Sequence, residues 1–141
     1  MCYNIDSGGK KHMTPKQFRK EANELFTQDY QYSIEHENPD VISSRQLHRK
    51  FKALLKTLFP DCTIHHTGGG YCEDSGFVEK DGHFVYISIS DLRFWKNWDQ
   101  DVLIRTAGSK TDYRGGRNNR TTLDKLQEDV YKLLTQTHTS W

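Results

Sequence analysis

The sequence has few cysteines, few prolines and no long apolar run. Its three cysteines, Cys2, Cys62 and Cys72, are an odd number, which does not fit the paired framework of a small disulfide-rich secreted protein. No apolar run approaches the roughly 18 residues that indicate a transmembrane helix. Residues 1–12 are polar and contain no apolar segment of the kind found in signal peptides. These absences predict a cytoplasmic protein that has no membrane partner.

The composition fits one domain of ordinary size. A chain of 141 residues is long enough to bury about two thirds of its extended surface, so it needs no disulfide or metal to fold. Hydrophobic residues make up only 34% of the chain, and the 12% that are aromatic partly offset this because each ring carries a large apolar area. We expect residues 1–12 to form a flexible N-terminal tail and residues 13–141 to form a single α+β domain.

The hydrophobic spacing changes along the chain from helical to alternating. Thr14-Pro15 is typical of a helix start, and a second helix should begin near Ser43 and end at Pro60. The turn Asp81-Gly82, followed by an alternating segment, predicts a β-hairpin. Val102–Ala107 is predicted to be a further strand. The element order is ααββββα, which favours an antiparallel sheet of three to four strands with helices packed on one face.

Residues 105–120 have the least ordinary composition in the chain, with five basic residues against one acid, Asp112. The adjacent glycines would let the backbone turn before a last helix that is predicted to begin at Thr121. Free N–H groups at a helix start, together with forked guanidinium donors, suit a phosphate or carboxylate. The predicted anion- or partner-binding residues are Arg105, Tyr113, Arg114, Gly115, Gly116, Arg117, Asn118, Arg120 and Thr121. The alternative is a tight turn with a solvated arginine fringe, in which Asp112 pairs with Arg105.

The second predicted helix carries another concentration of positive charge. Residues 41–60 contain five basic residues and no acid. Four of them recur at helical spacing and should share one stripe: Arg45, Arg49, Lys52 and Lys56. This basic helix face could lie along a nucleic-acid backbone or an acidic protein surface, and the alternative is a solvated face.

The aromatic segment 93–98 offers one candidate contact residue. Trp98 is flanked by Asn97 and Asp99, which favours exposure and contact with a base or a partner protein. The carboxylates of the acidic middle, residues 61–104, show no recognisable catalytic spacing. We therefore assign no catalytic residue.

Cysteine and histidine side chains are the usual ligands of zinc, and several of them lie close together in the sequence. The set comprises Cys62, His65, His66, Cys72 and His83. Its second half lacks the compact spacing of a zinc motif. His65 and His66 should also point to opposite faces of a strand, so only one of them could bind an ion. We assign neither a metal nor a cofactor.

Part of the sequence also resembles a group of known proteins. The residues that carry this resemblance are Tyr-Ile-Ser-Ile-Ser-Asp-Leu-Arg at 86–93, Val-Leu-Ile-Arg-Thr-Ala at 102–107 and Asp-Tyr-Arg-Gly-Gly-Arg-Asn at 112–118. They resemble segments of small uncharacterised accessory proteins of phages and mobile elements. The resemblance implies a binding or inhibitory protein in the host cytoplasm, and some such proteins inhibit host defence systems such as CRISPR.

These observations favour a non-enzymatic binding protein of phage or mobile-element origin. It would act on a nucleic acid, or on a nucleic-acid-handling host protein or nucleoprotein complex, through a basic surface formed by the loop and the helix. Two alternatives stay open: a pocket for a phosphorylated small molecule or nucleotide, and a metal-dependent nuclease or hydrolase. The strand at Val102–Ala107 would allow a homodimer if it lies at a sheet edge.

Overall fold

The computed structural model describes residues 13–22, 24, 42–68, 74–89 and 102–138, with the backbone alone at residues 42–45. The predicted tail at residues 1–12 and the predicted contact residue Trp98 lie outside these ranges.

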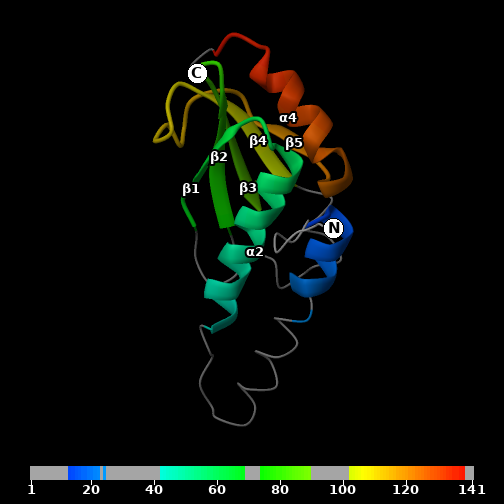
Figure 1. The fold of residues 1–141 in the computed structure, drawn as a ribbon. Helices are drawn as coiled ribbons and strands as arrows, with labels where there is room; N and C mark the ends of the chain where they lie inside the picture. Colours follow the sequence, from blue (N-terminus) through cyan, green and yellow to red (C-terminus); the bar gives the residue numbers. More distant parts are fainter. Residues whose placement is uncertain (1–12, 23, 25–41, 69–73, 90–101, 139–141) are drawn as a thin grey trace.

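The centre of the molecule is a five-stranded antiparallel sheet (Figure 1). Its strands are β1 (Thr63–His66), β2 (Asp74–Lys80), β3 (His83–Ile89), β4 (Val102–Ala107) and β5 (Asn119–Thr121). They pair in sequence order, each with the strand before it. The turn between β2 and β3 confirms the predicted hairpin, because Asp81 and Gly82 both have positive φ, 52° and 81°. Such angles are those of a two-residue turn that matches the twist of the strands.

The described helices share one hydrophobic core with this sheet. They are α2 (Ile42–Leu58), the short 3₁₀ helix η2 (Leu123–Lys125), α4 (Leu126–Leu134) and an N-terminal helix at residues 15–22. Figure 1 shows α2 running along the sheet with α4 beside its upper end. Both helices present an apolar side to the core: Leu47, Phe51, Leu54 and Leu55 from α2, and Leu126, Val130, Leu133 and Leu134 from α4.

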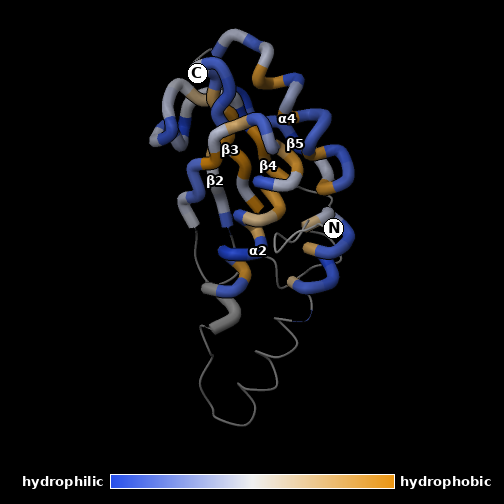
Figure 2. The backbone as a smooth tube through the Cα atoms, in the orientation of Figure 1, coloured by the Kyte–Doolittle hydropathy of each residue, from blue (hydrophilic) through white to orange (hydrophobic). Residues whose placement is uncertain are grey.

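Alternation along the strands separates a core-facing side of the sheet from an outer side. Val85, Ile87 and Ile104 are fully or almost fully buried against the helices, and the tube of Figure 2 shows this apolar centre in orange. The residues between them, such as Tyr86 and Arg105, therefore project from the outer side. Of the described helices, α2 and α4 contact the sheet, and both do so from its core-facing side.

The N-terminal helix is tied to the rest of the domain by polar contacts. The Thr14 hydroxyl caps this helix by accepting a hydrogen bond from the Gln17 N–H at 3.1 Å, which agrees with the predicted helix start at Thr14-Pro15. Lys50 of α2 lies 2.6 Å from the Glu21 carboxylate, and Arg19 lies 3.4 Å from Asp124 at η2. This helix therefore bridges α2 and the start of the C-terminal helical segment.

Two details of the prediction are wrong: the number of strands and the start of the last helix. The sheet has five strands rather than three to four, because Asn119–Thr121 pairs with Val102–Ile104. Val102–Ala107 is consequently an inner strand, with edge exposure limited to its last residues. Thr121 belongs to β5 and does not cap a helix. The side chain of Thr122 caps η2 instead, by accepting from the Lys125 N–H at 3.2 Å.

Within the part of the chain that the structure describes, no helix has the length and apolar character needed to cross a membrane.

Candidate functional site

The glycine- and arginine-rich loop between β4 and β5 folds back over the outer side of the sheet. Tyr113 packs edge-on against Phe77 and Tyr86, with ring centroids 5.3 and 5.8 Å away. The Arg105 guanidinium lies 4.8 Å from the centre of the Tyr86 ring, and it donates a hydrogen bond to the Tyr113 carbonyl. These four residues, Phe77, Tyr86, Arg105 and Tyr113, form what we call the aromatic–arginine cluster.

The cluster has a buried base and an exposed tip. Phe77 is fully buried beneath the rings, whereas Tyr113 is 46% exposed. Among the described residues, Tyr113 is the one large hydrophobic side chain that is exposed. Its packing against two other rings fixes the direction in which it faces solvent.

Asp112 holds the loop from within. One of its carboxylate oxygens accepts the Gly108 N–H at 2.8 Å and the other accepts the Gly115 N–H at 2.7 Å. The bond from Gly108 is the main reason why the pKa of Asp112 is lowered, although partial burial opposes it. The N–H group of Gly115, which was predicted to bind an external anion, therefore donates to an internal carboxylate instead.

Position 116 requires glycine for both a steric and a conformational reason. Its φ is +82°, and an added Cβ would lie 2.2 Å from the Thr106 carbonyl oxygen. The loop backbone therefore packs directly onto β4 at this point.

His138, near the C-terminal end of the described chain, ties the loop down a second time. Its Nε2 lies 3.5 Å from the Asp112 carboxylate and its Nδ1 lies 3.1 Å from the Thr106 hydroxyl. Thr106 is about nine-tenths buried, so this contact is largely shielded from solvent. The three residues anchor the loop to the sheet.

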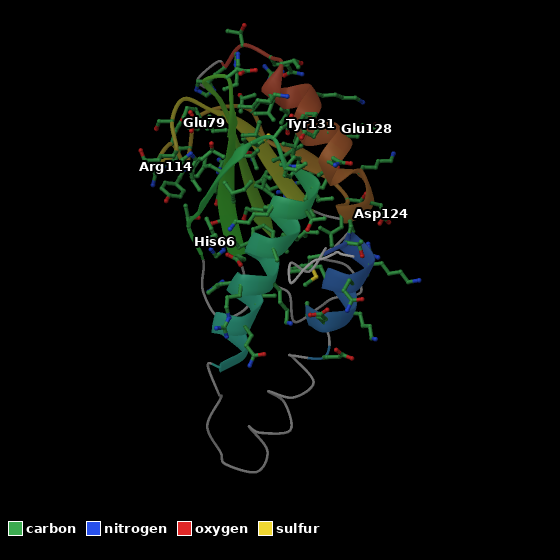
Figure 3. The ribbon with its side chains drawn as sticks, viewed as in Figure 1. His66, Glu79, Arg114, Asp124, Glu128 and Tyr131 are labelled. Carbon is green, nitrogen blue, oxygen red and sulfur yellow. The ribbon has the colours of Figure 1, made fainter. Side chains whose placement is uncertain are left out.

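The other predicted loop residues lie on the surface. Arg114, Arg117, Asn118 and Arg120 are all exposed. Arg120 pairs with Leu103, which lies on the same outer side of β4 as Arg105. Figure 3 shows Arg114 on the loop at the side of the sheet that lies away from α2. Thr121, in contrast, is buried and donates a hydrogen bond to the Asp129 carboxylate at 2.5 Å.

The predicted basic helix face is exposed but lies on the other side of the sheet. Arg49, Lys52 and Lys56 are exposed on α2, while the side chain of Arg45 lies outside the described structure. A Cβ added to Gly76 would lie 3.4 Å from Leu55 of α2, whereas the next residue, Phe77, contacts Tyr113 of the loop. The helix and the loop therefore occupy opposite faces of β2, and the two basic segments do not form one surface.

The cysteine and histidine set of the sequence does not converge. His65 lies 2.8 Å from Glu79 on the outer side, and His83 is exposed at the β2–β3 hairpin. Burial, reinforced by the neighbouring Asp61, raises the pKa of Cys62 to about 11, so this thiol is protonated near neutral pH. Cys72 lies outside the described residues.

A different group, which we call the His–Asp–His cluster, does converge. His48 of α2, His66 of β1 and Asp74 of β2 place one donor atom each within 4.8 Å of one another. His48 was not a predicted metal ligand, and Asp74 belongs to the acidic middle, residues 61–104, whose carboxylates show no recognisable catalytic spacing. Counting back along β2 from the Asp81-Gly82 turn would have placed Asp74 on the same face as Val78, which is the buried face.

Comparison with known proteins gives no further guide to the site, since no family model, curated protein sequence or solved structure matches this chain.

Proposed function

We propose that the protein is a binding protein that contacts single-stranded nucleic acid through the outer side of its sheet. The observation that carries this proposal is the exposed Tyr113 ring, held edge-on by Phe77 and Tyr86 in a loop rich in arginine. An exposed ring on a rigid support can stack on a base, and stacking requires a base that is not already paired and stacked in a duplex.

The charge around Tyr113 suits the phosphate backbone. The loop and its flanks carry Arg105, Lys110, Arg114, Arg117 and Arg120 against the single acid Asp112. That acid accepts N–H groups of the loop, so its charge is partly offset locally. The net charge of the whole chain is only +1, which means that attraction of a polyanion depends on this local concentration.

The same geometry favours a nucleic acid over a small phosphorylated ligand. A phosphate site built on the loop glycines would need their N–H groups, and Asp112 accepts those of Gly108 and Gly115. An extended ligand that stacks on Tyr113 and pairs with exposed guanidinium groups makes no such demand.

The test is fluorescence anisotropy with a labelled oligothymidine of about 16 nucleotides, the upper end of common site sizes. We expect binding at low salt that weakens steeply as salt is added. Tyr113→Ala should weaken binding by roughly 5- to 150-fold, the equivalent of about 1–3 kcal/mol of stacking. Tyr113→Phe keeps the ring and is the matched control, with thermal unfolding used to verify that both variants are folded.

Two results would count against direct contact. One is the absence of binding by the parent protein at low salt, and the other is equal binding by the parent, Tyr113→Ala and Tyr113→Phe. Pull-down from a host lysate with and without nuclease then identifies a nucleic-acid-handling protein as the partner if capture survives nuclease treatment. An inhibitor of a host defence system is one form that such a binding protein would take.

A further inference from the structure

The core-facing side of the sheet carries a second, unrelated feature in the His–Asp–His cluster. The Asp74 side chain is completely buried, while those of His66 and His48 are 15% and 23% exposed. The carboxylate is therefore buried beneath two partly exposed imidazoles, and the cluster is accessible to solvent from the side of the imidazoles.

Three elements bring these side chains together. His66 lies on the core-facing side of β1 because it pairs with Gly76, whose missing side chain leaves room next to α2. Asp74 precedes Gly76 by two residues and so faces the same way. His48 comes from the side of α2 that packs against this edge of the sheet, and its ring centroid lies 5.8 Å from that of His66.

The contacts of Asp74 are those of a ligand held in place. The Ser75 N–H donates to Asp74 Oδ1 at 2.8 Å, and His66 Nε2 lies 3.0 Å from the same oxygen. Asp74 Oδ2 is buried and accepts no hydrogen bond from the described residues, although it lies 3.0 Å from His48 Nδ1. That contact has the distance but not the geometry of a hydrogen bond. An oxygen buried in this way is costly unless another group compensates its charge.

We propose that His48, His66 and Asp74 form a binding site for a divalent transition-metal ion such as Zn²⁺. Two imidazole nitrogens and one carboxylate are a common ligand set for such ions, with remaining positions open to water. Ligand atoms bonded to an ion at about 2.1 Å lie roughly 3.0–3.5 Å apart. His66 Nε2 lies 3.0 Å from Asp74 Oδ1 and His48 Nδ1 lies 3.0 Å from Asp74 Oδ2. The two imidazoles thus approach different oxygens of the carboxylate, and with one donor atom from each residue the set lies within 4.8 Å. Side-chain rotation on ion binding would close the remaining distance. The Ser75 N–H would then orient the carboxylate.

Isothermal titration of the full chain with Zn²⁺, in the presence of a reductant that does not bind metal, tests the site. We expect one equivalent to bind and to raise the unfolding temperature. Asp74→Asn and His66→Gln should each weaken binding by at least about 100-fold, since loss of even an outer-shell partner costs about 10- to 100-fold. His65→Gln is the matched control, because the side chain of His65 lies on the face of β1 opposite to that of His66. This variant should bind Zn²⁺ as the parent does.

Cobalt supplies a readout of the ligand set that is independent of affinity. Substitution with Co²⁺ should give visible absorption typical of nitrogen and oxygen ligands in the parent and in His65→Gln, and this should be lost in His48→Gln. The proposal is overturned if the parent binds no Zn²⁺, or if stoichiometric binding survives unchanged in Asp74→Asn and His66→Gln, as it would for an ion held by cysteines elsewhere. These outcomes are separate from oligonucleotide binding, which involves the other side of the sheet.

Discussion

Asp112 is the single side chain on which the shape of the arginine-rich loop most depends. It accepts N–H groups from both sides of the turn and contacts His138. A sequence containing one acid among five basic residues suggests an ion pair, and pairing of Asp112 with Arg105 was the alternative expected. The structure instead shows Arg105 on the Tyr86 ring and the Tyr113 carbonyl. The counts of charged residues did not predict this arrangement, because they do not show which backbone N–H groups the fold brings close to the Asp112 carboxylate.

Replacing Asp112 with alanine should therefore destabilise the protein in a pH-dependent way. At pH 7 we expect a loss of about 1–2 kcal/mol in the free energy of unfolding, because two loop amides lose their acceptor. The folded pKa of Asp112 is lowered, so its contribution is present above the unfolded pKa of about 3.9 and is lost as pH falls through the folded value. Urea denaturation at a series of pH values measures the difference between parent and variant.

The matched control is Glu128→Ala, which removes an exposed acid from α4. It should change stability by less than about 0.5 kcal/mol. If the Asp112→Ala difference were the same at pH 3 and pH 7, the carboxylate would not be acting through its charge.

Among the elements, the amphipathic helix α2 and the β2–β3 hairpin were predictable from the sequence, and the shortest strand, β5, was not. Leu47, Phe51 and Leu54 of α2 recur at helical spacing, and all three are buried. β5 has three residues, Asn119–Thr121, with no hydrophobic alternation. It exists because the loop returns the chain beside Val102–Ile104. That return depends on tertiary contacts such as Gly116 on Thr106, which no local pattern encodes.

The docking of α2 can be measured at Leu54, which is fully buried. Leu54→Ala should cost about 2–5 kcal/mol in the free energy of unfolding, the range for a large-to-small change in a core. Lys52→Ala, two residues earlier on the exposed side, is the control and should be close to neutral. Chemical denaturation gives both values, and a near-zero loss for Leu54→Ala would mean that this side of α2 does not form the core.

Across the whole molecule, the sheet separates two basic surfaces that look related in the sequence. The exposed residues of α2 and the arginines of the loop lie on opposite faces of β2. The sequence contained both concentrations of charge, and it could not show that a layer of strands lies between them. A ligand that binds on the loop side of the sheet therefore does not contact the basic helix face unless it passes around the edge of the sheet.

This arrangement predicts how charge removal affects oligonucleotide binding. Arg114→Gln combined with Arg117→Gln should lower affinity and reduce the slope of log K against log salt by up to about 0.7 for each phosphate that is no longer neutralised. A variant that combines Arg49→Gln, Lys52→Gln and Lys56→Gln should have nearly unchanged affinity and an unchanged salt slope. Anisotropy titrations at several salt concentrations compare the loop variant with the helix variant. Equal losses of affinity in the two variants would show that the basic helix face also contacts the oligonucleotide.

The order of the strands has a consequence for how the protein forms as it is synthesised. Each strand pairs with the one before it, so the sheet can grow hairpin by hairpin as the chain leaves the ribosome. The aromatic–arginine cluster joins β2, β3 and β4 to the loop that follows them, and α4 covers the core after that. The aromatic–arginine cluster is therefore complete only after Tyr113 has been synthesised, so under the proposed function a nascent chain that ends before this residue lacks the exposed ring.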